Sequence, residues 1–219
     1  ISNKLDRRGD EKKEVLELPQ ITYLTAAIHS FLNEINENTS KNDDELNTVL
    51  SKIKLTYDNL STHKITFSTP RITYGLSPRA QFASCVLITP GDDTESLNEA
   101  DASAAIYSKN MGGISMDFSY IRSRGSSIYA NGGKSDGPIP FIKRYEQTIN
   151  AFNQAQKRAG SGIVHFPWWH HDVMDLIMLK DAGGTEGLRA RSLKYSIKLN
   201  KILFDRYKNN DYVTLYDPK

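Results

Sequence analysis

The alternation of apolar patterns along the 219 residues predicts an α/β protein that begins with an antiparallel pair of helices. Two apolar stripes at helical spacing come first, and short apolar runs then alternate with further helical patterns. The resulting order, β, β-α, β, α, β-α, β-α, β, is typical of a sheet with much parallel pairing. Hydrophobic residues make up 38% of the chain and charged residues 25%, which is the composition of a globular protein.

Charge and cysteine content narrow the class of function. The net charge of +2 is too balanced for a dedicated nucleic-acid or membrane surface, so a small anionic ligand at a local site is the better expectation. One cysteine excludes an internal disulfide framework. No apolar run approaches the roughly 18 residues of a membrane span or follows a signal-peptide pattern. We therefore expect a cytoplasmic protein, in the host cytoplasm if its source is a virus.

The first 62 residues predict a flexible lead and a helical segment. Residues 1–18 are mostly polar without apolar period, which favours a flexible lead. Pro19 suits the first turn of a helix, and residues 36–44 are a polar loop. The two stripes that make residues 19–62 a helix pair are Ile21, Leu24, Ile28, Phe31 and Ile35, then Leu46, Val49, Ile53, Tyr57 and Leu60.

Residues 63–219 predict the alternating part. Residues 65–67 and the apolar run 81–88 favour strands, and a turn at residues 90–93 closes the second of them. Asp92 and Glu95 then resemble a capping box at the start of a helix that Gly112 and Gly113 end. Residues 122–137 are rich in glycine and serine and predict a loop. Helices follow near residues 142–152, 173–179 and 200–208, strands near 163–169, 193–199 and 212–216, and a loop at 153–162.

Three features could carry chemistry, and each also has an ordinary explanation. Cys85 is placed on a strand beside a turn, where α/β proteins often meet a ligand, but lone cysteines are mostly inert core residues. His165, His170 and His171 with Asp172 invite a metal hypothesis, although adjacent histidines share one ion poorly and His171 or Asp172 could cap a helix, so we predict no metal site. The cations Arg122, Arg124 and Lys134 could hold phosphates or belong to a solvated loop. None of the glycine-rich loops matches a Walker or a dinucleotide-binding fingerprint.

Taken in order, these features resemble the large catalytic subunit of class I ribonucleotide reductase. The similarity runs without obvious gaps from about Ile65 to Pro218. The series that carries it is Ser68-Thr69-Pro70, Cys85, Gly91-Asp92, Gly112-Gly113-Ile114, residues 121–128, Pro138-Ile139-Pro140-Phe141, residues 154–162 and Pro167-Trp168-Trp169-His170. The resemblance implies a ten-stranded α/β barrel made of two five-stranded halves, of which residues 63–219 would be the first.

The resemblance also implies a redox site. Cys85 matches the first of two cysteines that reduce the ribose and become a disulfide, which requires a second thiol within reach. Thr69, Ser84, Gly112 and Gly113 match substrate-side positions. The second thiol, the radical-bearing cysteine and the cysteine tail have no counterpart in these 219 residues. We therefore expect catalysis only with a chain that carries the rest of the barrel, a small radical-generating subunit and an external dithiol reductant such as thioredoxin or glutaredoxin.

Regulatory positions are better represented. The resemblance implies a deoxynucleoside triphosphate or ATP effector, bound with Mg²⁺ between two large subunits of a homodimer. Asp92 matches the residue that holds the effector ribose and Arg122 the one that holds its phosphates, with Asp93, Thr94 and Ile128 beside them. Residues 119–137 and 153–162 match two effector loops, the second with Gln154 and Arg158 as signalling residues.

Two departures and two alternatives accompany this assignment. Tyr129 stands where some members have a second phosphate-side arginine, and that contact could shift to Lys134 or Arg124. Gln156 and Lys157 stand where many members of the family have small residues such as glycine. Which substrate base each effector selects can therefore differ from those members. A cobalamin-dependent class II reductase shares the same barrel and loops. A non-catalytic nucleotide-binding regulator with a buried Cys85 is the other alternative.

Overall fold

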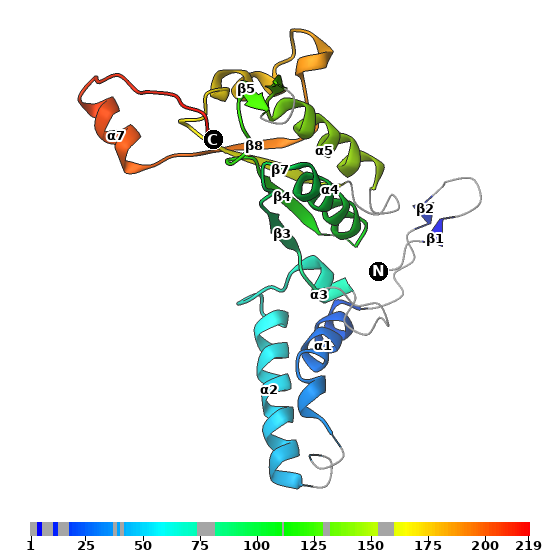
Figure 1. Ribbon diagram of the computed structural model, residues 1–219. Helices are drawn as coiled ribbons and strands as arrows, with labels where there is room; N and C mark the ends of the chain where they lie inside the picture. The colour runs from blue at the N-terminus through cyan, green and yellow to red at the C-terminus, as the bar shows by residue number, and fades with distance from the viewer. Residues whose placement is uncertain are drawn as a thin grey trace. The chain divides into compact units, whose positions relative to one another are not determined.

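The chain forms two compact units, Ile1–Ser84 and Cys85–Lys219. The computed structural model in Figure 1 describes residues 4–5, 11–12, 18–36, 39, 42–73, 82–110, 112–128, 132–152 and 160–219. The helical patterns in the sequence predict a boundary at residue 63. The structure instead groups residues 63–84 with the first unit.

A pair of helices forms most of the first unit. Helix α1 (Pro19–His29) has Pro19 in its first turn, and α2 (Asp43–Ser61) is capped by Asn42, whose side chain accepts hydrogen bonds from two backbone N–H groups. Ala27, Val49 and Ile53 form the buried contact between the two helices. The first helix is shorter than its apolar stripe predicts, because the chain turns at Ser30 and continues as a 3₁₀ turn, Leu32–Glu34.

Two local predictions for the first unit are wrong. Residues 65–67 form no strand, and the chain instead enters a short helix, α3 (Thr69–Thr73). The lead contains two antiparallel strands, β1 (Lys4–Leu5) and β2 (Glu11–Lys12), where no regular element was expected. Segments of two to five residues are too short for a sequence period to identify.

Four parallel strands build the second unit. They are β3 (Cys85–Ile88), β4 (Gly113–Asp117), β7 (Gly162–Pro167) and β8 (Lys194–Lys198), paired in this order. Helix α4 (Thr94–Lys109) connects β3 to β4, and α5 (Ile139–Ala151) precedes β7. Along the chain, each strand of this sheet pairs with the next strand of the same sheet, as in a barrel. In a doubly wound sheet the strand order would reverse at one point. The predicted α/β class is confirmed, and the described part of the second unit holds an open four-stranded sheet.

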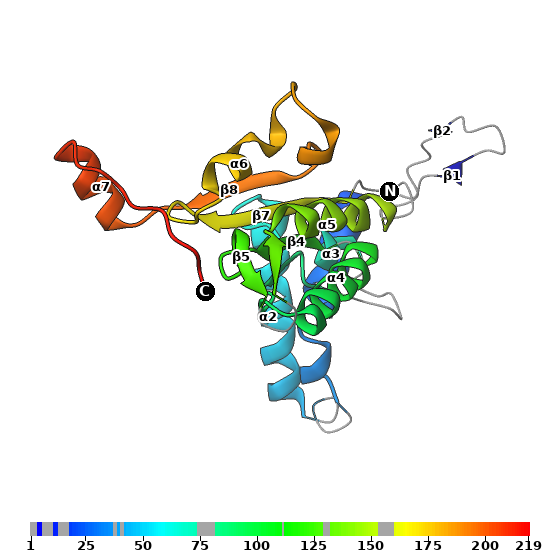
Figure 2. The ribbon, with the colours of Figure 1, turned by 45° about the horizontal axis from the view of Figure 1, so that its top comes forward.

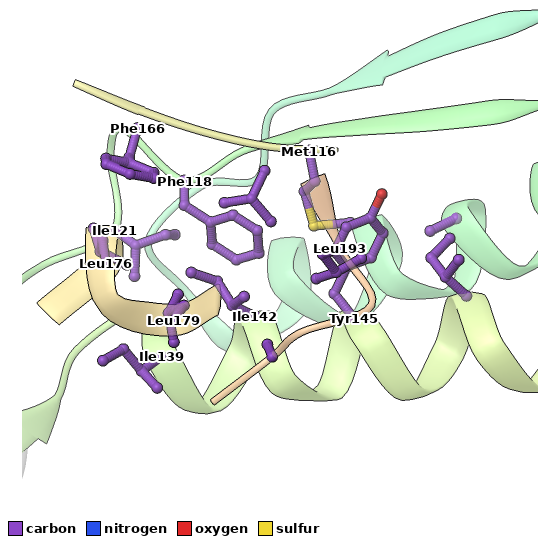
Figure 3. Close-up of a cluster of buried hydrophobic side chains, with 14 of the residues drawn as sticks. Met116, Phe118, Ile121, Ile139, Ile142, Tyr145, Phe166, Leu176, Leu179 and Leu193 are labelled. Atoms are coloured by element: carbon purple, nitrogen blue, oxygen red, sulfur yellow. The ribbon is translucent and has the colours of Figure 1, made fainter. Parts of the chain in front are cut away.

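Helices cover one face of this sheet. Side chains of α4, α5 and α6 (Val173–Ile177) pack with Ile114, Met116, Val164 and Phe166 in a single core, part of which is drawn in Figure 3. Tyr145 of α5 is buried there, and its hydroxyl donates a hydrogen bond to the carbonyl of Ile114 over 2.9 Å. Burial raises the pKa of this phenol. The core fixes α5 against the strands, so the loops at both ends of the sheet start from fixed positions.

Alternate strand residues point to the opposite face. Cys85 and Leu87 of β3 are exposed there, and Leu87 is 79% exposed. Ser115 and Asp117 of β4 and His165 of β7 share this face, since their neighbours along each strand face the core. We call it the uncovered face.

The last predicted strand is absent from the described structure. After α7 (Lys201–Lys208), which extends away from the sheet in Figure 2, residues 212–216 form only one isolated bridge, between Tyr216 and His170. The ring of Tyr216 stacks on Trp169 at 4.4 Å, so this segment is held by an aromatic contact where a ladder was expected.

Candidate functional site

Loops at the carboxyl edge of the sheet bring five of the seven predicted effector residues together. The loop after β3 ends at Asp93, whose side chain accepts a hydrogen bond from Ser96 N over 2.8 Å and so caps α4. The predicted cap at Asp92 is therefore wrong by one residue. Because Asp93 caps the helix, the Asp92 carboxylate does not, and it pairs instead with Arg122 in the loop after β4.

Asp92 and Arg122 form the central ion pair of this edge. Arg122 donates from its backbone N to Asp92 Oδ1 over 3.0 Å and from Nε to Asp92 Oδ2 over 2.7 Å. The Arg122 side chain is 19% exposed and the Asp92 side chain 7%. A charge-assisted pair of this geometry, largely shielded from water, fixes the loop after β4 to the loop after β3.

A cavity of about 350 Å³ opens beside this ion pair. Asp92, Asp93 and Thr94 contribute to one side of it, and Arg122 and Ile128 to the other. All five belong to the predicted effector set. The remaining lining residues are Glu95, Leu97, Ile121, Ser135 and Phe141. The cavity thus combines charged groups with apolar walls, as small-molecule sites commonly do.

The glycine- and serine-rich segment forms a β-hairpin rather than the predicted loop. Strands β5 (Arg124–Ile128) and β6 (Gly133–Asp136) pair antiparallel, with a register shift between Arg124 and Ser127. Gly137 has a φ of +75°, and a Cβ there would lie 2.7 Å from Asp172 Oδ2, so only glycine fits. The signal missed in the sequence is the glycine pair 132–133 between two short polar strands.

The loop after β7 fixes the base of this hairpin. His170 is fully buried, and its Nε2 donates to the carbonyl of Ile121 over 2.9 Å while its Nδ1 accepts from Asp172 N. Asp172 Oδ2 accepts from Arg124 N over 2.8 Å. Asp172 thus holds the hairpin, and the side-chain cap on α6 considered above is not formed. Within the described residues, no cluster of three or more histidine, cysteine or acidic side chains is placed to hold a metal ion.

Asp217 fixes the hairpin from a third direction. It accepts hydrogen bonds from Ser123 N over 3.2 Å and from the Ser126 hydroxyl. Burial alone would raise the pKa of this carboxyl, but the bonds from Ser126 and from backbone N–H groups outweigh it and lower the pKa. The backbone at residues 121–126 is therefore held by side chains from three separate loops.

Three of the predicted redox and substrate positions, Cys85, Gly112 and Gly113, lie at the other end of the strands. The register pairs Cys85 with Gly113 and Ile114 with Gly162, which places Cys85, Gly112 and Gly113 at the amino edge. The expectation that Cys85 lies where the turn feeds the helix is wrong, because that turn follows Ile88 at the carboxyl edge. Cys85 is exposed on the uncovered face, which contradicts its interpretation as a buried core residue.

The other predicted residues are placed only in part. Gly112 closes α4, where its N–H donates to the carbonyl of Tyr107 over 3.0 Å. Thr69, at the start of α3, and Ser84 belong to the first unit, so the complete substrate-side grouping stays a prediction. Gln154 and Arg158 lie outside the described residues. Their flanking residues Phe152 and Gly160 are described, and a bond from Ser108 Oγ to the carbonyl of Phe152 ties one flank to the end of α4.

The uncovered face carries polar pairs that the sequence did not indicate. His165 Nε2 lies 2.5 Å from Ser115 Oγ, and Lys198 Nζ forms an ion pair with Asp117 Oδ2. Burial opposes ionisation of Asp117, but the bonds from Lys198 and Ser119 prevail and lower its pKa. These residues come from three neighbouring strands, so their grouping depends on strand register, which a single sequence does not give.

A second cavity of about 470 Å³ lies on the other side of the hairpin. Arg124 and Lys143 line it together with Asp136, Asp172 and Asp175. Arg124 is paired with Asp175 at 3.7 Å, and Lys143 donates to two backbone carbonyls. The cations of this cavity are thus engaged within the protein.

Comparison with known proteins identifies the class to which this fold and site belong. A family model for the ribonucleotide reductase barrel domain matches residues 83–219. The chain therefore belongs to the ribonucleotide reductase barrel-domain family.

Particular relatives are alpha subunits of ribonucleoside-diphosphate reductase. The chain is 31% identical over 205 residues to the subunit of Enterobacteria phage T4, and 32% identical over 205 residues to subunit alpha of reductase 1 from Escherichia coli K12. It is also 33% identical over 208 residues to the large chain of Encephalitozoon cuniculi. Each match covers 94% of this chain but only 25–26% of the relative, so the chain spans about a quarter of their length. None of the described helices is long and apolar enough to cross a membrane.

Proposed function

We propose that this chain provides part of the catalytic alpha subunit of a ribonucleoside-diphosphate reductase, with a nucleoside triphosphate effector cavity at the carboxyl edge and a redox cysteine at the amino edge. The observation that carries the proposal is the cavity at Asp92 and Arg122. Five residues assigned to an effector site from the sequence, in segments far apart along the chain, line one cavity of about 350 Å³.

The chemistry of the cavity suits a nucleotide bound as a magnesium complex. Arg122 supplies a guanidinium for phosphate oxygens, while Ile128, Leu97 and Phe141 supply apolar surface for a base or sugar. Asp92, Asp93 and Glu95 add negative charge, which a triphosphate tolerates best when Mg²⁺ accompanies it. The metal would arrive with the nucleotide, with Asp92 orienting the ribose.

Cys85 would supply one of the two thiols that reduce the substrate ribonucleoside diphosphate. In that step two thiols give up two electrons and two protons and form a disulfide, and a dithiol such as thioredoxin or glutaredoxin restores them. The exposed position of Cys85 leaves its sulfur accessible for such exchange. The second thiol and the radical would come from the chain carrying the remaining barrel strands and from a small radical-generating subunit.

Helix α5 offers a connection between the two edges. Phe141 near its start lines the effector cavity, and Phe152 just after its end and Gly160 just before β7 lie at the amino edge. Strand β4 alone is about 16 Å long, so Phe152 and Gly160, which flank the segment with Gln154 and Arg158, are well separated from the cavity of the same copy. We propose a homodimer in which the segment of one copy contacts the effector held by the other.

The assembly proposal is tested by complementation. The 219-residue chain alone should show no ribonucleotide reduction, because it has one cysteine. Activity should appear when the chain with the rest of the barrel and the radical-generating subunit are added with a dithiol. Reduction that requires cobalamin instead of that subunit would support the class II alternative, and no reduction under either condition would support the regulator.

The effector cavity is tested by removing its central carboxylate. Asp92→Ala should weaken deoxynucleoside triphosphate binding by roughly 10- to 100-fold, the scale of hydrogen bonds to charged groups. Asp175→Ala, which changes a carboxylate of the second cavity, is the matched control and should bind as the wild type does. Unchanged affinity in Asp92→Ala and in Arg122→Ala would place the effector elsewhere.

A further inference from the structure

Residues 215–219 bring a cation, Lys219, next to Asp92, one of the residues that line the effector cavity. Leu215 packs on the core of the second unit, and Tyr216 exchanges backbone hydrogen bonds with the loop after β7, accepting from His171 N and donating to the carbonyl of Trp169. Asp217 then accepts hydrogen bonds from Ser123 N and from Lys219 N, each over 3.2 Å. These contacts hold the segment beside the hairpin base and place Lys219 next to Asp92.

Lys219 and Arg122 contact the same carboxylate oxygen but differ in how strongly they are engaged. Arg122 donates from Nε to Asp92 Oδ2, from Nη1 to the carbonyl of Ser127 and from Nη2 to the carbonyl of Asp92. Lys219 Nζ lies 3.5 Å from Asp92 Oδ2, which is a long ion pair. The lysine side chain is 56% exposed, against 19% for Arg122. The lysine can therefore leave Asp92 at much lower cost than the arginine can.

The cavity has a deficit of positive charge for a polyphosphate. Its lining includes three carboxylates, of Asp92, Asp93 and Glu95, and one guanidinium, of Arg122. Arg124, one alternative considered from the sequence, lines the second cavity instead. Neither Lys134 nor Lys219 is part of the lining itself, but Lys219 forms an ion pair with Asp92, which is. Lys219 is the nearby cation that the sequence did not indicate.

We propose that Lys219 is a phosphate-binding residue of the effector cavity. On binding of the triphosphate, its ammonium group exchanges the carboxylate of Asp92 for phosphate oxygens, while Asp217 keeps the backbone of the segment in place. Lys219 thereby supplies the second phosphate-side cation in a chain that has Tyr129 where some members have arginine. The inference rests on the effector cavity of the proposed function.

The test measures how affinity depends on the number of phosphates. Binding of dTTP, dTDP and dTMP, each with Mg²⁺, is measured calorimetrically for the full 219-residue chain and for Lys219→Gln, Lys219→Arg and Lys201→Gln. We expect Lys219→Gln to lose about tenfold in affinity for dTTP and progressively less for dTDP and dTMP. Lys219→Arg should retain most of the affinity. Lys201, an exposed lysine of α7 paired with Asp205 at 3.8 Å, is the matched control.

The outcomes separate this inference from the proposed function. If Asp92→Ala weakens dTTP binding and Lys219→Gln does not, the effector cavity of the proposed function is supported and the role of Lys219 is refuted. Equal losses for all three nucleotides would also refute it, because they would indicate that Lys219 acts through the fold. If the wild-type chain binds none of them, both the effector cavity and the inference fall.

Discussion

The two edges of the parallel sheet differ in how completely this chain builds them. At the carboxyl edge, three loops and residues 215–219 hold one another through charge-assisted hydrogen bonds around a cavity. At the amino edge, Cys85 is exposed and is the one cysteine of the sequence. The proposed effector cavity is thus built from residues of one chain, whereas the proposed redox chemistry depends on a second thiol supplied from elsewhere.

The largest expected effect is on turnover, from a substitution at the amino edge that leaves the carboxyl edge intact. In the assembled enzyme, Cys85→Ser should lower multiple turnover with a dithiol reductant by at least about 10³-fold, because a serine cannot form the disulfide that carries two electrons. Triphosphate affinity, measured on the same preparation, should be unchanged because the carboxyl edge is intact. Turnover at the wild-type rate would remove Cys85 from the chemistry.

A smaller effect is expected from changing the two proposed signalling residues. Gln154→Ala and Arg158→Ala should change which base is reduced under each effector by roughly 5- to 100-fold, the usual range of coupling between sites. Effector affinity itself should change less. Reduction of the four substrates with each effector provides the measurement, and a wild-type pattern of preferences in both variants would make residues 153–159 a passive connection.

The smallest effect concerns the stability of the carboxyl edge. Asp217→Asn should lower the free energy of unfolding by about 1 kcal/mol at pH 7, because the ionised carboxylate accepts bonds from Ser123 and Ser126. The folded-state pKa of Asp217 is lowered, so this contribution is present above the unfolded pKa of about 3.9 and is lost as the pH falls through the lower folded value.

Urea unfolding at pH 7 and near pH 2.5 would measure that difference. The gap between wild type and Asp217→Asn should narrow at the lower pH, and Asp205→Asn on α7 should show little effect at either. A gap of equal size at both pH values would show that the carboxylate charge of Asp217 does not stabilise the fold.

Long elements with a clear period were predictable from the sequence. The helix pair and α5 follow from apolar residues at steps of three and four, and β3 and β7 from short apolar runs between turn residues. The assignment of Asp92, Arg122 and Ile128 to one site came from the resemblance to a family, and the structure places all three at one cavity.

Elements without such a period were missed for identifiable reasons. The β5–β6 hairpin has few apolar residues, so its composition indicated a loop. The Asp117–Lys198 pair and the position of Lys219 depend on contacts between residues far apart in the chain, and no local pattern encodes those. The helix cap was predicted at Asp92 and lies at Asp93, because the sequence does not distinguish between two adjacent aspartates as caps.

The strand order β3-β4-β7-β8 has a consequence for how the protein folds during synthesis. Each strand of this sheet pairs with a strand that has already been translated, so no strand must wait for a later segment to leave the ribosome. The core under β3, β4 and α5 can therefore form before β8 is complete. A sheet that grows in this way at a single edge can take up further strands one after another without rearranging those already paired.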